Sequence, residues 1–289
     1  MPTRLRIRAY AKVNLGLRVL GRRPDGYHEL QTIMQTIGLH DELELEPREG
    51  RGGIELEQPR ALPVPAEENL VYRAARLFCR EHSLQAGPRI SLKKGIPVGA
   101  GLGGGSSDAA ATLAGLNRLF GLNLNVDELA RLGAHLGSDV PFFIHGGTCL
   151  VEGRGEWVKR LPPLPRYTVV LILPPCRLST AEVYRRFDVL QGKGDRTYTY
   201  TFVEHPRHLR NDLEPAALAL APELARYRDA LATLQPEPRA WGLSGSGPAW
   251  FALFSTAEKA EAALDALRQE LREAELILTG LTDRGYEFI

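Results

Sequence analysis

A glycine-rich stretch followed by an alanine-rich segment is the part of the sequence best suited to bind a charged ligand. Residues 97–108 read Pro-Val-Gly-Ala-Gly-Leu-Gly-Gly-Gly-Ser-Ser-Asp, and apolar residues then recur at helical spacing. Glycine leaves backbone N–H groups unshielded by a Cβ, so an anion can approach them closely. Ser106, Ser107 and Asp108 are common N-cap types, which predicts that a helix begins directly after them. A loop of free N–H donors at the positive end of a helix predicts a phosphate-binding site.

The loop does not match the two commonest phosphate-binding patterns. Gly105 is followed by two serines and an aspartate, not by the Gly-Lys-Ser/Thr ending of a P-loop. The dinucleotide fingerprint can be laid over Gly99, Gly101 and Gly104, but no strand–helix–strand unit with a suitably spaced acidic residue accompanies it. A glycine-rich turn without a ligand is the remaining alternative, and the conformational cost of glycine disfavours it.

Four residues outside the loop could also do chemistry. Lys12 lies between two strand-like runs, so it is either a solvated strand lysine or a cation that holds an oxygen or a phosphate. Asp139 precedes the apolar residues 140–143, and it is either a helix N-cap or a functional carboxylate. Tyr27 and His28 follow a Pro-Asp-Gly turn and place an aromatic face beside a hydrogen-bonding ring. Such a pair more often packs than binds a ligand.

Five stretches, in order along nearly the whole chain, resemble motifs of the GHMP kinases, a family of small-molecule kinases unrelated to the P-loop enzymes. They are residues 9–15, 24–30, 97–110, 137–143 and 243–248. The second and fourth resemble the branch of this family that acts on 4-diphosphocytidyl-2-C-methyl-D-erythritol in the non-mevalonate isoprenoid pathway. The resemblance implies ATP-dependent phosphorylation of the 2-hydroxyl of that compound, with Mg²⁺ as the metal.

The resemblance also implies roles for individual residues. Asp139 would take the proton from the acceptor hydroxyl as it attacks the γ-phosphorus, and Lys12 would hold the hydroxyl and the carboxylate in register. The residues implied to bind ATP are Pro97, Val98, Gly99, Ala100, Gly101, Leu102, Gly103, Gly104, Gly105, Ser106, Ser107, Asn69 and Lys94. The residues implied to bind the acceptor are Asn14, Tyr27, His28, Thr180 and Tyr184. Mg²⁺ would be held mainly by ATP oxygens, with no side chain assigned and the hydroxyls of Ser106 and Ser107 as the nearest candidates.

Strands and helices in mixed order must position these residues, which indicates an α+β fold. The length of 289 residues favours two domains, expected at residues 1–150 for ATP binding and at residues 151–289 for the C-terminal GHMP kinase domain. The resemblance implies a ribosomal-protein-S5-domain-2-like fold for the first domain and a ferredoxin-like fold for the second.

Apolar periodicity predicts the individual elements. The expected strands are residues 4–8, 13–20, 41–46, 54–57, 148–152, 156–161, 168–173, 249–254 and 275–279. The expected helices are residues 70–82 with Asn69 as a cap, 125–136, 223–234, and segments that begin after Asp108, near Leu178 and after a Ser255–Glu258 capping box. The segments 41–46 and 54–57 should form a hairpin with a solvated acidic face. The pair 148–152 and 156–161 should open the second domain, and the wholly apolar run 168–173 should be a central strand.

Composition and charge exclude several classes of function. A net charge of +1 gives no electrostatic reason to expect a nucleic acid or an anionic membrane as partner, and nothing indicates an obligate protein partner. Cys79, Cys149 and Cys176 stand far apart, which argues against a disulfide framework or a cysteine-rich zinc site. Without a signal-like or membrane-length apolar segment, a soluble cytoplasmic protein is expected.

Two alternatives stay open. Another kinase of the same family would act on homoserine, mevalonate or a sugar, and only the residues matched to the cytidine end speak against it. A non-catalytic member would bind nucleotide and metabolite as a sensor, which the presence of Lys12 and Asp139 argues against.

Overall fold

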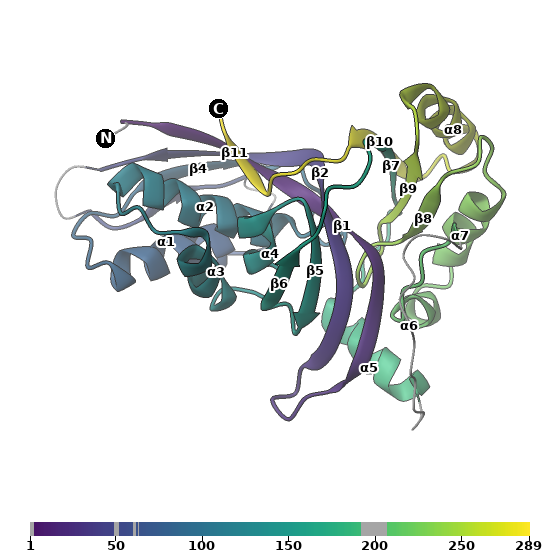
Figure 1. Ribbon diagram of the computed structural model, residues 1–289, viewed down its shortest axis with the longest axis horizontal. Coiled ribbons are helices and arrows are strands. Elements are labelled where there is room, and N and C mark those ends of the chain that lie inside the picture. Colours follow the sequence, from purple (N-terminus) through teal and green to yellow (C-terminus); the bar gives the residue numbers. More distant parts are fainter. Residues whose placement is uncertain (1–2, 49–51, 60–61, 63, 192–206) are drawn as a thin grey trace.

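The computed structural model describes residues 3–48, 52–59, 62, 64–191 and 207–289, and it contains two sheets with helices packed against them (Figure 1). The first sheet is formed by β1 (Leu5–Arg22), β2 (His28–Glu46), β3 (Glu55–Glu57), β4 (Arg89–Lys93), β5 (Thr148–Gly153), β6 (Trp157–Arg160) and β11 (Tyr286–Phe288). The order β11-β1-β2-β4-β3 crosses one end of β2, while β5 pairs with its other end and β6 pairs with β5. The predicted α+β class is confirmed.

β1 is one strand of 18 residues, not the two short strands that periodicity predicts. Its register with β2 shifts beside Tyr10 and again after Asn14, yet pairing continues through Lys12. Such bulges interrupt the alternation of side chains without ending the strand, which explains the wrong boundary. β1 therefore stays paired with β2 up to Arg22, and along this stretch Leu17 also bridges to Asn211 of the second half of the chain.

The predicted hairpin between residues 41–46 and 54–57 is wrong. β4 lies between the two segments, pairing antiparallel with β2 and parallel with β3. Alternation identifies the face of a strand but not its partner, so adjacency in sequence was a poor guide here.

The strand pair expected at residues 148–152 and 156–161 exists as β5 and β6, which are antiparallel. It does not open the second sheet, because β5 pairs with residues 30–35 of β2. The predicted boundary at residue 150 falls inside β5.

Helices cover one face of the first sheet (Figure 1). They are the 3-10 turn η1 (Ala66–Glu68), α1 (Leu70–Glu81), α2 (Gly104–Phe120), α3 (Val126–Ala134) and α4 (Val140–His145). The Asn69 side chain accepts a hydrogen bond from the Val71 N–H, so the predicted cap of α1 is confirmed. α2 begins before Ser106, not after Asp108, because Gly103 takes a left-handed conformation with φ 75° and its carbonyl closes the first turn. The predicted capping serines therefore lie inside the helix.

The second sheet has the order β10-β7-β9-β8. Its strands are β7 (Thr168–Leu173), β8 (Ala240–Leu243), β9 (Trp250–Phe254) and β10 (Glu275–Gly280). The accompanying helices are α5 (Thr180–Gln191), α6 (Glu214–Leu220), α7 (Leu224–Thr233) and α8 (Ala257–Glu270). β7 pairs on both sides, which confirms the predicted central strand. Thr256, not Ser255, caps α8 by accepting from the Lys259 N–H. Among the described helices, none combines the length and the apolarity needed to cross a membrane.

A hydrophobic cluster joins the two sheets. Val13 and Leu15 of β1 pack with Leu171 of β7 and Phe251 of β9, and all four are buried. Because successive side chains of a strand point to opposite faces, Lys12 and Asn14 lie on the face of β1 opposite to Val13 and Leu15. The same strand thus joins the sheets and carries the polar residues of the site.

Candidate active site

The glycine loop borders a cavity of about 390 Å³, a size typical of small-molecule pockets. η1, the start of α1 and the first turn of α2 complete its wall. Its lining includes every residue predicted to bind ATP except Ser107. Ser107 is buried, and its hydroxyl donates to the carbonyl oxygen of Tyr10 at 2.6 Å. Of the two serines, Ser106 is therefore the one that lines the cavity.

Glycine is required at two positions of the loop. Gly101 has φ 77°, and an added Cβ there would lie 2.7 Å from the carbonyl oxygen of Ser244. Gly103 has φ 75°, and an added Cβ would lie 2.7 Å from the Phe143 ring. L residues rarely adopt this conformation, so both positions are restricted by backbone geometry and by space. The loop is thereby packed tightly against the third glycine motif and α4.

Lys12 lies where three of the sequence motifs meet. Its side chain is buried, with the residue 4% exposed, and its ammonium donates to the carbonyl oxygen of Gly101 at 2.8 Å and to Asn14 Oδ1 at 2.5 Å. A Cβ on Gly245 would lie 3.1 Å from that Oδ1, so the third motif packs against the same pair. Burial lowers the pKa of Lys12, while the charge of Asp139 opposes this shift. The arrangement holds a cation beside the loop.

Asp139 precedes α4 as its N-cap residue, but in the described structure its carboxylate makes no capping hydrogen bond to that helix. Its charge acts on Lys12 and also on Tyr184, whose pKa is raised mainly by burial and further by Asp139. The Asp139 charge is thus felt both by Lys12 of β1 and by Tyr184 of α5. The alternative that Asp139 simply caps α4 therefore lacks the hydrogen bond that a cap would make.

A buried network of charged side chains lies next to the glycine loop. Lys94 bonds to the carboxylates of Asp41 and Asp108, at 2.8 Å for Asp108. Asp41 also accepts from the N–H groups of Gly95 at 2.6 Å and Ile96 at 2.8 Å. Burial alone would lower the pKa of Lys94, but the two carboxylates outweigh it and raise that pKa. Burial raises the pKa of Asp108 well above its usual range.

Sequence reasoning missed the roles of both aspartates. It assigned Asp41 to a solvated acidic face, but the residue is 0% exposed. Asp41 is in phase with the buried Leu43 and Leu45 of β2, and that alternation was the available signal. Asp108 was assigned to a helix cap, whereas it borders the cavity with one oxygen that has no hydrogen-bond partner among the described residues.

The residues predicted to bind the acceptor come from three places: Asn14 from the middle of β1, Tyr27 and His28 from the β1–β2 turn and the start of β2, and Thr180 and Tyr184 from α5. The His28 ring stacks on Tyr184 with 4.8 Å between ring centroids, and its Nε2 lies 2.7 Å from Asp188 Oδ1. The Thr180 hydroxyl lies 2.9 Å from the Ser246 hydroxyl of the third motif. The structure thus brings His28 and Tyr184 together. It leaves Tyr27 apart from this stack and 53% exposed.

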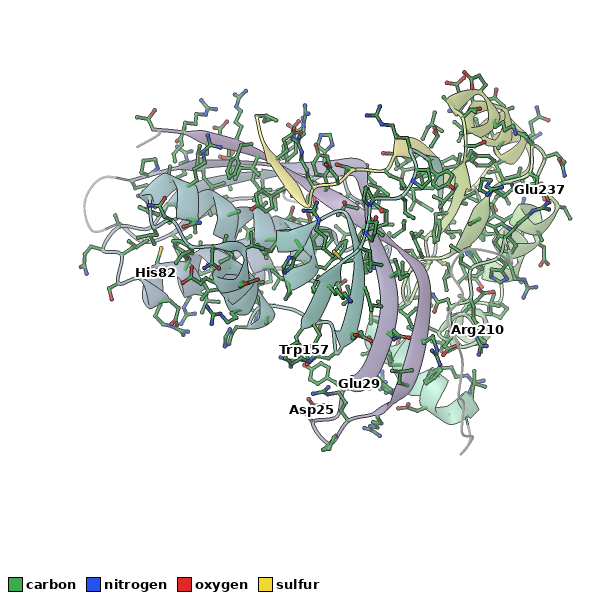
Figure 2. All side chains as sticks on the ribbon, in the orientation of Figure 1. Asp25, Glu29, His82, Trp157, Arg210 and Glu237 are labelled. Atoms are coloured by element: carbon green, nitrogen blue, oxygen red, sulfur yellow. The ribbon has the colours of Figure 1, made fainter. Side chains whose placement is uncertain are left out.

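The turn that carries Tyr27 joins β1 to β2. Its Asp25 and Glu29, labelled in Figure 2, both pair with Arg23, at 3.3 Å and 2.6 Å. The Arg154 guanidinium lies 5.3 Å from the centroid of the Tyr27 ring, which is a cation–π contact. The tip is therefore held by charged contacts beside the β5–β6 turn.

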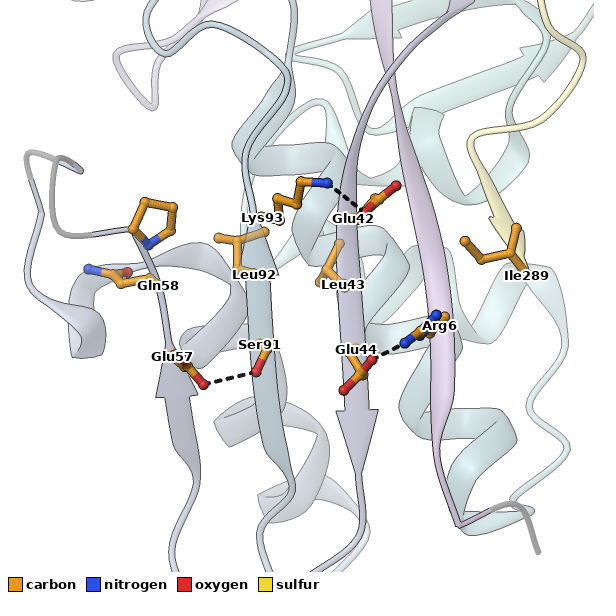
Figure 3. A pocket seen from close by; sticks show the side chains of 11 residues that line it. Arg6, Glu42, Leu43, Glu44, Glu57, Gln58, Ser91, Leu92, Lys93 and Ile289 are labelled. Atoms are coloured by element: carbon orange, nitrogen blue, oxygen red, sulfur yellow. Dashed lines mark hydrogen bonds and ion pairs between the residues drawn. The ribbon is translucent and has the colours of Figure 1, made fainter.

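A larger cavity of about 550 Å³ lies on the first sheet, away from the motifs (Figure 3). Its charged groups already pair with one another, as Lys93 does with Glu42 at 3.2 Å and Arg6 with Glu44 at 3.0 Å. No residue predicted for the site lines it. We therefore assign the site to the smaller cavity beside Lys12.

Comparison with known proteins agrees with this site. Residues 69–147 match the GHMP kinases N terminal domain, and residues 203–273 match the GHMP kinases C terminal domain. The chain is 43% identical over 281 residues to 4-diphosphocytidyl-2-C-methyl-D-erythritol kinase of Pelotomaculum thermopropionicum, covering 94% of this chain and 96% of that one. It is 44% identical over 287 residues to the kinase of the same name from Moorella thermoacetica, covering 93% and 96%.

A solved structure agrees as well. The crystal structure of a 4-(cytidine 5'-diphospho)-2C-methyl-D-erythritol kinase superposes with a TM-score of 0.79 at 38% identity, covering 96% of this chain and 98% of that one. The two-domain GHMP kinase fold and the motif resemblance are thereby confirmed. The chain belongs to the GHMP kinases, in the family of 4-diphosphocytidyl-2-C-methyl-D-erythritol kinases.

Proposed function

We propose that this chain is an ATP-dependent kinase that phosphorylates the 2-hydroxyl of 4-diphosphocytidyl-2-C-methyl-D-erythritol, a step of non-mevalonate isoprenoid precursor synthesis. The observation that carries the proposal is the convergence of three motifs on Lys12, whose ammonium bonds to the glycine loop at Gly101 beside a cavity of about 390 Å³. The named relatives supply the acceptor, since they share more than two fifths of their residues with this chain.

Asp139 is the proposed general base. It takes the proton of the acceptor hydroxyl while the hydroxyl oxygen attacks the γ-phosphorus, and the bond from that phosphorus to the bridging oxygen of ADP breaks. Lys12 is a fixed positive charge beside this step, because the Gly101 and Asn14 oxygens hold its ammonium. It offsets the negative charge that builds up on the transferring group.

The glycine loop is the proposed phosphate site. The first N–H groups of α2 have no partner earlier in the helix, and the dipole of the helix adds a positive potential at the same point. Gly104 and Gly105 begin that first turn and border the cavity, so ATP phosphates can approach the backbone without meeting a side chain.

The residues at the cavity fit Mg²⁺ bound together with ATP. Ser106 and Asp108 both line the cavity, and the Asp108 Oδ1 is buried without a hydrogen-bond partner among the described residues. Oxygen donors of this kind are what Mg²⁺ prefers, and it commonly binds through one or two of them with substrate phosphates. The metal would supply charge neutralisation on the phosphates, and Ser106 and Asp108 would hold it.

The acceptor is proposed to bind between the two sheets. Asn14 and Thr180 face the polar junction near the third motif, while His28 and Tyr184 form the aromatic end proposed for cytosine. Tyr27 would turn its ring toward the same base. We also propose two domains, with the division in the connection between β6 and β7 instead of at residue 150, because β5 and β6 pair with the first sheet.

A single activity experiment tests this function. The purified chain is offered ATP, Mg²⁺ and, in separate reactions, 4-diphosphocytidyl-2-C-methyl-D-erythritol, homoserine and mevalonate, and ADP release is measured together with the phosphorylated product. We expect turnover with the cytidine compound alone. Preference for homoserine or mevalonate would reject the acceptor but keep the kinase, whereas no ADP release with any acceptor would reject the kinase.

A further inference from the structure

One face of α5 encloses the His28 ring from three sides. Tyr184, Phe187 and Asp188 are spaced i, i+3 and i+4, so their side chains share this face. Tyr184 stacks on the ring at 4.8 Å, Phe187 meets it edge-on at 6.2 Å, and Asp188 Oδ1 lies 2.7 Å from its Nε2. The His28 side chain is only 10% exposed, so the ring has little room to turn.

These contacts join distant parts of the chain. His28 begins β2 next to the β1–β2 turn, whereas α5 follows β7 of the second sheet, and Figure 1 shows α5 beside the far ends of β1 and β2. No sequence pattern pointed to a role for Asp188, because 160 positions separate it from His28. Only the fold brings Asp188 next to His28.

Asp188 decides which ring nitrogen carries the proton. A carboxylate can only accept a hydrogen bond, so the neutral imidazole must place its N–H on Nε2. Nδ1 is then left with a lone pair, and it has no hydrogen-bond partner in the described ranges of the chain. A hydrogen bond at one ring nitrogen thus fixes the chemical character of the other.

We propose that Asp188 is a positioning residue that presents His28 Nδ1 as an acceptor for the exocyclic amino group of cytosine. This inference rests on the proposed function and assigns the discrimination of its base to a residue outside the family motifs. Cytosine carries an N–H₂ donor at the position where uracil carries a carbonyl oxygen. In uracil, an oxygen would face the Nδ1 lone pair, and two acceptors would then oppose each other. The His28–Asp188 pair therefore selects cytidine over uridine.

The test compares two acceptors that differ only in the base, 4-diphosphocytidyl-2-C-methyl-D-erythritol and its uridine analogue. kcat/KM is measured for each with the wild type, Asp188→Ala and Asp188→Asn. The asparagine keeps the size of the side chain, but its amide can also donate, so it no longer fixes the proton of His28. We expect the cytidine-to-uridine ratio to fall about tenfold in both variants, the scale of one lost hydrogen bond, with the KM for ATP unchanged.

Glu182→Ala is the matched control, because this acidic residue lies on the same helix with its side chain 58% exposed and pairs with Arg185. It should keep the wild-type ratio. In a His28→Ala background, Asp188→Ala should change the ratio no further, since its effect passes through the ring.

The outcomes separate this inference from the function on which it rests. A wild type that prefers cytidine and Asp188 variants that keep the same ratio, even at lower activity, would overturn the positioning role alone. A wild type that phosphorylates neither compound would overturn the proposed function and this inference with it.

Discussion

The Lys12 ammonium donates to the carbonyl oxygen of Gly101 at 2.8 Å, across 89 positions of sequence. The same oxygen accepts from the Ser244 hydroxyl at 3.2 Å, so β1, the glycine loop and the third motif share one acceptor. A change at Lys12 therefore disturbs the phosphate loop as well as the charge beside the acceptor. Because of this coupling, the proposed base gives a cleaner test of the chemical step than the lysine does.

Asp139→Asn should lower kcat by about 10²- to 10⁴-fold, the usual contribution of a general base, while the dissociation constant for ATP changes little. The amide has nearly the same shape but cannot take the acceptor proton. Steady-state kinetics and nucleotide titration measure the two effects. Asp127→Asn, at an exposed acidic position in the first turn of α3, is the control. Turnover of the Asp139 variant within a few-fold of wild type would remove Asp139 from the reaction.

The lowered pKa of Lys12 predicts an alkaline loss of activity. Burial moves this pKa below 10.5, and the protonated form is the one that offsets transition-state charge, so kcat should fall as pH rises through the lowered value. The free energy of unfolding should change with pH in the opposite direction to kcat. Between the lowered pKa and 10.5 the unfolded chain binds more protons than the folded one, so in this window the free energy of unfolding should rise with pH.

The pH profile of kcat for wild type and Lys12→Arg checks this assignment. A guanidinium stays protonated across the whole range, so the arginine variant should be slower but should lack the alkaline decline. The same decline in both proteins would assign it to another group.

Gly105→Ala tests whether the loop binds phosphate through its backbone. An added Cβ there meets only Leu70 Cδ1, at 3.5 Å, which is ordinary contact, whereas at Gly103 it would collide with Phe143. Alanine also stabilises a helix by about 0.5–1 kcal/mol relative to glycine. We expect weaker ATP binding in a protein that is no less stable, measured by nucleotide titration and urea unfolding. Gly53→Ala, where an added Cβ meets no atom within 4 Å, should leave ATP binding unchanged. An unchanged affinity in Gly105→Ala would mean that phosphates do not approach this turn.

Structural features that lie in a local pattern were predicted well from the sequence. The glycine loop, the Asn69 cap and the buried strand β7 depend on neighbours within a few positions, and all three were found. Strand partners were predicted poorly. β4 lies between β2 and β3. Strand pairing depends on the packing of the whole sheet, which the alternation of polar and apolar residues does not encode.

The start of α2 and the link between His28 and Asp188 could not be predicted for a related reason. The start depends on one left-handed glycine among several candidates, since Gly99, Gly101 and Gly103 all have positive φ. The link between His28 and Asp188 depends on how α5 packs beside β2. Asp41, in contrast, was predictable from its phase with Leu43 and Leu45, but its charge was taken as a sign of exposure.

Asp41→Ala should destabilise the protein by about 3–5 kcal/mol, the cost of removing one partner from a buried ionic network. The change leaves the N–H groups of Gly95 and Ile96 without their acceptor and leaves Lys94 with Asp108 as its remaining carboxylate. Urea unfolding measures the loss. Glu42→Ala is the matched control, because the neighbouring side chain is 42% exposed and pairs with Lys93 at the surface. An exposed pair of this kind contributes about 0–1 kcal/mol. Equal losses in the two variants would mean that Asp41 contributes no more than a surface carboxylate, and the buried network would not be what holds the glycine loop in place.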